Sequence, residues 1–208
     1  MTQQASRLQA LTLFVACAAV FVAGYQLTLR RALRLPDLPT SALPWDDWVP
    51  FWPASIVVYS SINLAYPLAF IVVRDAERLH ALAARLLAVQ LVCFACFTVW
   101  PMRMQRLPDA EASVWAPWFA ALGTFDGASN LVPSLHVAIL GVLWWHVRAS
   151  VQPRAGRLGC DAWAAAVALS ALTTWQHHLI DVLAGAAVAA AVVRGGLLDI
   201  AFLKERGT

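Results

Sequence analysis

Long apolar runs separated by short polar segments dominate this chain from its N-terminal region to its C-terminal region. A helix needs about 20 predominantly apolar residues to cross a bilayer. Six windows approach or exceed that length, which predicts an all-α fold: an integral membrane bundle of six transmembrane helices in a single domain over residues 1–208. The predicted spans are residues 8–29, 53–74, 80–101, 132–149, 157–176 and 178–203.

The segment that precedes the second predicted span has a different pattern. Between Leu35 and Pro53 the prolines are too closely spaced for a regular helix. Trp45, Trp48 and Trp52 lie in the same stretch, and tryptophan is typical of membrane interfaces. We expect an interfacial segment that forms a partial lid.

Composition supports a membrane protein. Of the 208 residues, 61% are hydrophobic and 13% are charged, whereas soluble domains are nearer one half and one quarter. The net charge is +3 and no basic run stands out, so no nucleic-acid partner is expected. The cysteines lie in or beside the apolar runs and are interpreted as buried thiols; they are Cys17, Cys93, Cys96 and Cys160.

Six spans place both termini on one side of the membrane, and positive charge is greater on that side. By the positive-inside rule, the termini are predicted to be cytoplasmic and the opposite face periplasmic, extracellular or lumenal. The terminal side holds Arg7, Arg74, Arg78, Arg85, Arg148, Arg154, Arg157, Arg194, Lys204 and Arg206, and the other side holds Arg30, Arg31, Arg34, Arg103 and Arg106.

The strongest chemical signal is H-H-L-I-D near the start of the last predicted span. His177 and Asp181 are four residues apart, a spacing that places two side chains on one face of a helix. A carboxylate fixes the tautomer of a neighbouring imidazole, and the other ring nitrogen can then attack phosphorus. We expect His177 to be a nucleophile that Asp181 orients, with His178 turned away on the same helix.

A second signal, V-P-S-L-H, begins the fourth predicted span. Proline and serine suit a helix start, where free amides favour anions. A phosphate could therefore bind near the amides of Ser134, Leu135 and His136. From this position His136 could protonate a leaving alkoxide as a general acid.

Arg103 and Arg106 follow the third predicted span on the same outer face. Guanidinium groups match phosphate oxygens and stabilise phosphoryl-transfer charge. Asp181 is too isolated to form a magnesium cluster, so neither a metal nor another cofactor is expected. Each residue alone has a structural explanation, such as an arginine that snorkels to the interface. Their convergence on one face favours a phosphoryl-transfer site.

At these residues the chain resembles the type 2 phosphatidic acid phosphatase superfamily of six-span lipid phosphatases. The P-S-L-H-V-A of residues 133–138 and the H-H-L-I-D-V-L-A-G of residues 177–185 carry the resemblance. It implies a nucleophile at His177, an orienting aspartate at Asp181, a general acid at His136 and a phosphate ligand at Arg106. Arg103 would substitute for missing basic partners.

The chain departs from this pattern in two places. Ala171 stands where the third segment has arginine, and the first segment lacks its leading lysine. At these positions the chain resembles the inositol phosphorylceramide synthase branch of the superfamily and its bacterial relatives. That branch has a D-x-x-x-P-F-x-P stretch, matched here from Asp47 with one residue fewer, and Thr174 and Gln176 before the histidine.

The leading hypothesis is a lipid phosphatase that acts on a lipid phosphate or phospholipid at the outer face. Head-group transfer to a lipid alcohol uses the same phosphoenzyme and remains an alternative. Histidines of different spans could instead bind b-type haem in an electron carrier. A non-catalytic membrane adaptor is the third hypothesis. The specific lipid and the oligomeric state do not follow from the sequence.

Overall fold

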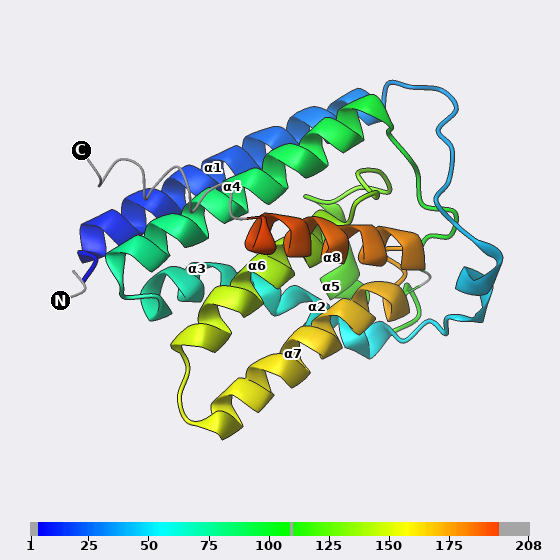
Figure 1. Ribbon diagram of the computed structural model, residues 1–208. Coiled ribbons are helices and arrows are strands. Elements are labelled where there is room, and N and C mark those ends of the chain that lie inside the picture. The colour runs from blue at the N-terminus through cyan, green and yellow to red at the C-terminus, as the bar shows by residue number, and fades with distance from the viewer. Residues whose placement is uncertain (1–3, 109, 196–208) are drawn as a thin grey trace.

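The computed structural model describes residues 4–108 and 110–195, and the regular structure in those residues is helical (Figure 1). The all-α prediction is confirmed. The helices are α1 (Arg7–Ala32), α2 (Ile56–Ser60), α3 (Ile62–Val72), α4 (Ala76–Val99), α5 (Ala116–Gly123), α6 (Leu135–Ser150), α7 (Arg154–Thr173) and α8 (Leu179–Arg194), with short 3₁₀ turns η1 (Pro44–Trp48) and η2 (Pro53–Ser55).

Three helical stretches in the described residues are long and apolar enough to cross a membrane. They are Arg7–Ala32, Pro53–Val72 and Ala76–Val99, and they correspond to the first three predicted spans. The other predicted spans contain α6, α7 and α8. Residues 196–203 of the last predicted span lie outside the described residues.

Close helix contacts at small residues hold the bundle together. Helix α1 lies along α4 (Figure 1), and a Cβ added at Gly24 would come within 2.2 Å of the Phe94 ring. Helix α6 packs against α8, where a Cβ at Gly141 would come within 2.5 Å of the Ala189 Cβ. Such close approach is typical of small residues between membrane helices.

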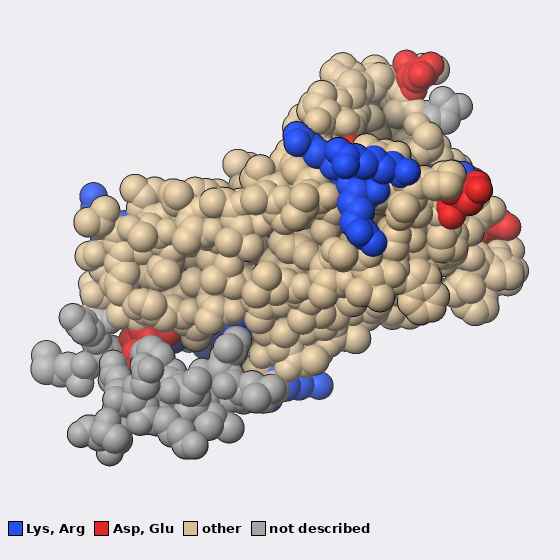
Figure 2. All heavy atoms as spheres, turned by 90° about the horizontal axis from the view of Figure 1, so that it is seen from above, with Lys and Arg blue, Asp and Glu red and all other residues tan. Residues whose placement is uncertain are grey.

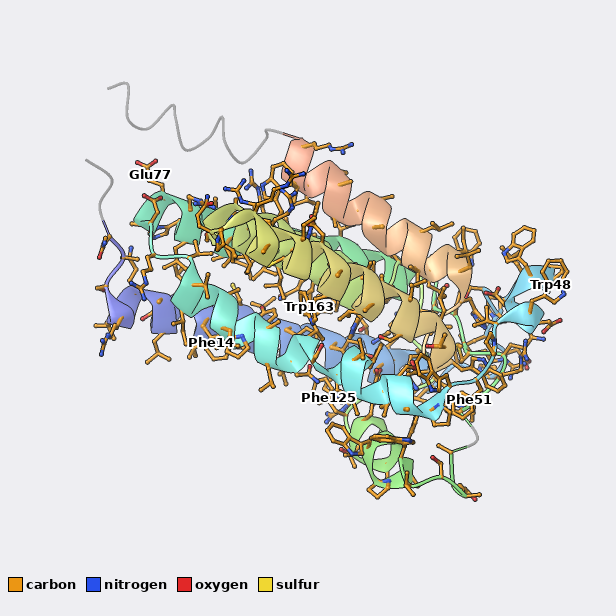
Figure 3. All side chains as sticks on the ribbon, turned by 90° about the horizontal axis from the view of Figure 1, so that it is seen from below. Phe14, Trp48, Phe51, Glu77, Phe125 and Trp163 are labelled. Carbon is orange, nitrogen blue, oxygen red and sulfur yellow. The ribbon has the colours of Figure 1, made fainter. Side chains whose placement is uncertain are left out.

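The connections that carry the candidate site gather at one end of the bundle. The loop after α1, the loop after α4 and the start of α8 lie together, far from the start of α1 (Figure 1). Trp48 and Phe51 mark this end in Figure 3, and Glu77 marks the other. On the face seen in Figure 2, a wide uncharged band separates the charged groups near the two ends.

The segment before the second span contains no α-helix, as its prolines predict. It is attached to α7 and to the loop that follows α7. The Trp52 amide donates to the Thr173 carbonyl at 2.8 Å, and the Trp175 indole donates to the Val49 carbonyl at 3.2 Å. These bonds hold the segment over the end of the bundle where α8 begins.

Candidate active site

His177 lies in the turn between α7 and α8. Its amide donates to the Ala171 carbonyl at 3.0 Å, and Trp175 adopts a left-handed φ of 53°. Because α8 begins at Leu179, the expectation that His177 and Asp181 share a helix face is wrong. The turn nevertheless brings the two side chains together, with 3.5 Å between His177 Nδ1 and Asp181 Oδ2.

Asp181 is fully buried in the first turn of α8. Its Oδ2 accepts the amide of His178 at 2.8 Å, so the same carboxylate caps the helix and faces the His177 ring. This capping bond fixes the position of the carboxylate relative to the backbone. The carboxylate and the His177 ring are therefore adjacent, although His177 Nδ1 makes no hydrogen bond within the described residues.

His178 is held in a different environment. Its Nδ1 forms a hydrogen bond with the Ser41 hydroxyl at 2.7 Å, and 5% of the residue is exposed. The imidazole thus connects the N-terminus of α8 to the segment that follows α1. Its contacts suit a structural role.

His136 lies in the first turn of α6 and stacks on Tyr59, with ring centroids 4.0 Å apart and planes at 7°. Its Nε2 is buried without a hydrogen-bond partner in the described part of the chain. The Ser134 hydroxyl caps the helix by accepting the Val137 amide at 3.3 Å. The Ser134 amide donates to the Asp181 carbonyl at 2.9 Å, so it is already occupied. The amides of Leu135 and His136 belong to the first turn, where amides have no partner within the helix.

His136 and His177 line one cavity of about 550 Å³ between α1, α2, α3, α5 and α6. Its walls are mainly aromatic and aliphatic, and Phe14 and Phe125 lie at different depths along it (Figure 3). An apolar cavity next to two histidines can accept a molecule that has both a reactive polar group and a hydrocarbon part. Its other lining residues are Ala18, Phe21, Tyr25, Tyr59, Ser60, Ile62, Asn63, Tyr66, Pro67, Trp118, Ala121, Leu122, Asp126, Asn130, Leu135 and Ile139.

Of the two predicted arginines, Arg106 lies beside the histidines. It lines a small pocket of about 20 Å³ together with His177 and His178. Its guanidinium stacks 4.9 Å from the centre of the Trp175 ring and pairs with Asp47 at 2.5 Å.

Arg103 lies differently from Arg106. Its backbone amide donates to the Pro39 carbonyl at 2.8 Å. Its side chain is exposed and lines neither pocket that contains His177.

Sequence reasoning missed Asp46. This buried carboxylate accepts the Leu179 amide at the start of α8 and the Leu43 amide, each at 2.8 Å. The D-x-x-x-P-F-x-P stretch is complete when it is counted from Asp46 instead of Asp47, and this spacing could have identified the residue. Ala171, at the position of the expected arginine, is fully buried in an apolar cluster with Tyr59.

A family model described as the PAP2 superfamily matches residues 51–194. The chain belongs to the PAP2 superfamily. The matched stretch contains Arg106, His136, His177 and Asp181, and membership supports a phosphatase-type enzyme with a lipid-related function. No curated protein and no solved structure matched the chain.

Proposed function

We propose that this PAP2 superfamily member cleaves a phosphate ester of a lipid at the outer face of the membrane, through a phosphohistidine on His177 and without a metal ion. The observation that carries the proposal is that His177 and His136 line one apolar cavity, while Asp181 lies 3.5 Å from His177 Nδ1. This leaves His177 Nε2 as the reactive nitrogen.

The first half-reaction forms the phosphoenzyme. His177 Nε2 attacks phosphorus, the phosphorus–oxygen ester bond breaks, and His136 gives a proton to the departing alkoxide. Asp181 stabilises the positive charge on the imidazole. Arg106, which shares the small pocket with His177, binds phosphate oxygens once its guanidinium turns from Asp47.

The second half-reaction releases the phosphoryl group. The hydroxyl of water or of an alcohol attacks phosphorus, the phosphorus–nitrogen bond breaks, and His136 takes a proton from the attacking hydroxyl. Water gives a phosphatase, and a lipid alcohol gives a head-group transferase. The apolar lining of the cavity supports a lipid as the donor in both cases.

The test is phosphate release from a panel of lipid phosphates by purified protein in detergent with EDTA. We expect His177→Ala and Asp181→Asn to abolish turnover, because they remove the nucleophile and its orienting carboxylate. His178→Ala is the matched control, and we expect it to keep most of the activity because its ring bonds to Ser41 outside the large cavity.

Full activity in His177→Ala would refute the nucleophile assignment. If the wild type releases no phosphate and transfers none to an alcohol, the haem-binding electron carrier and the non-catalytic adaptor become the favoured hypotheses. An absorbance scan of the same sample then separates them, because a haem carrier shows a Soret band and an adaptor does not.

A further inference from the structure

Tyr25, Asp126 and Asn130 form a polar corner in the lining of the large cavity, because Tyr25 is hydrogen-bonded to both of the others. The two candidate catalytic histidines line the same cavity. The Tyr25 hydroxyl donates to Asp126 Oδ1, and the Gly127 amide donates to the same oxygen at 2.9 Å. Both of these hydrogen bonds end on Oδ1, so Asp126 Oδ2 is available to accept a hydrogen bond from a ligand.

Asn130 provides a second spare acceptor. It is 3% exposed, and its Nδ2 donates to the Tyr25 carbonyl at 3.1 Å and to Thr28 Oγ1 at 3.0 Å. Because Thr28 Oγ1 uses its own proton to bond the Gly24 carbonyl at 2.9 Å, it must accept from Asn130. These bonds fix the orientation of the amide, and Asn130 Oδ1 is left buried without a partner in the described residues.

The two hydrogen-bond acceptors at this corner determine which class of ligand is favoured there. A buried acceptor without a partner, as Asn130 Oδ1 is, costs about 1–3 kcal/mol, so a ligand that donates protons is favoured. Phosphate oxygens carry negative charge and are disfavoured beside a carboxylate and an amide oxygen. Asp126 and His177 line the same cavity.

We propose that Asp126 and Asn130 hold the water molecule that resolves the phosphohistidine, which makes the enzyme a phosphatase in preference to a transferase. This inference rests on the proposed function. Water has two protons, so it can give one to His136 while the other is shared between the acceptors Asp126 Oδ2 and Asn130 Oδ1. A monohydric alcohol has a single hydroxyl proton and cannot do both.

The water oxygen attacks phosphorus, the bond from phosphorus to His177 Nε2 breaks, and its electron pair returns to the imidazole. One proton of the water passes to His136, which lost a proton to the alkoxide in the first half-reaction. The other proton stays on the phosphate, which leaves.

The experiment measures how the phosphoryl group of the phosphoenzyme is partitioned between water and methanol as acceptors. Purified protein turns over a lipid phosphate in the presence of methanol, and methyl phosphate and inorganic phosphate are quantified. For the wild type we expect inorganic phosphate to predominate. Asp126→Ala and Asn130→Gly should raise the ratio of methyl to inorganic phosphate about tenfold, the effect of one lost hydrogen bond.

The choice of variants keeps the test interpretable. Glycine at position 130 tolerates the φ of 63° found there. Asp126→Asn keeps the shape of the side chain and replaces the alanine variant if that protein does not fold. Gln26→Ala is the matched control: it removes a 2.8 Å bond to the Phe125 carbonyl in the same loop without touching the cavity, and its ratio should equal that of the wild type.

Two results would overturn the inference: a wild type that forms mainly methyl phosphate, or Asp126 and Asn130 variants that keep the wild-type ratio. In either case, phosphate release that disappears in His177→Ala leaves the proposed function standing. A wild type that cleaves no lipid phosphate rejects both the function and the inference.

Discussion

Burial shifts the pKa of the Asp126 carboxyl group. Burial raises its pKa above the ordinary value of 3.8, and the hydrogen bond from Tyr25 and the nearby His177 imidazole offset only part of that effect. The folded protein therefore holds this proton more tightly than the unfolded chain does. Its contribution to stability is present at low pH and is lost as the pH rises through the raised pKa.

This predicts a pH-dependent difference between the wild type and Asp126→Asn. The stability of the wild type relative to the variant should fall as the pH rises above about 4, because the asparagine has no proton to lose. Thermal unfolding midpoints in detergent from pH 4 to pH 8 measure the difference. A constant difference over that range would contradict the prediction.

At the residue scale, the sequence singles out the two histidines and the aspartate as candidates, but it does not single out the residues that surround and support them. His136, His177 and Asp181 stand in short motifs whose spacing indicates their chemistry. Asp46 and Asn130 instead make hydrogen bonds to segments that are distant in the sequence. Such contacts depend on how the helices pack, and local spacing does not contain that information.

At the scale of the elements, the contact between α6 and α8 positions the site. Each helix brings one candidate catalytic segment, and the Ser134 amide joins them by its bond to the Asp181 carbonyl. Gly185 permits this approach, because a Cβ there would lie 2.4 Å from the Ser134 carbonyl oxygen. The long helices were predictable from their apolar runs, whereas the helix start at Leu179 depends on caps from Asp181 and Asp46.

Gly185→Ala should therefore lower both stability and activity. The added methyl group pushes α8 away from Ser134, and overpacking of this kind costs about 1–3 kcal/mol. Unfolding midpoints and phosphate release from a lipid phosphate measure the two effects.

Gly159→Ala in α7 is the matched control, since no atom lies within 4 Å of its added Cβ. We expect its activity to be unchanged and its stability to be equal or slightly higher. Equal stability and activity of Gly185→Ala and Gly159→Ala would contradict the prediction, because it would show that the site does not require the close contact between α6 and α8.

At the scale of the whole molecule, the candidate site and the end of α6 lie at opposite ends of the bundle (Figure 1). The distribution of arginine and lysine predicts that the site end faces outward. Val114 is 85% exposed in the loop that follows α4, and Ala149 is exposed in the last turn of α6. These two positions can report the orientation.

We expect a cysteine at position 114 to react with a membrane-impermeant maleimide on intact cells, and a cysteine at position 149 to react only after lysis. The background variant replaces Cys96 and Cys160 with serine, because these natural thiols are partly accessible while Cys17 and Cys93 are buried. The reverse labelling pattern would overturn the predicted orientation.

Helix α1 lies outside the stretch that matches the family, yet Phe14, Ala18, Phe21 and Tyr25 from this helix form one wall of the cavity. The residues proposed to react thus lie in the part of the chain that matches the family, whereas one wall of the cavity lies in a part that does not. Mutations in the first helix can remodel the wall while leaving the reacting groups intact. In this architecture, substrate preference can diverge during evolution without loss of the underlying chemistry.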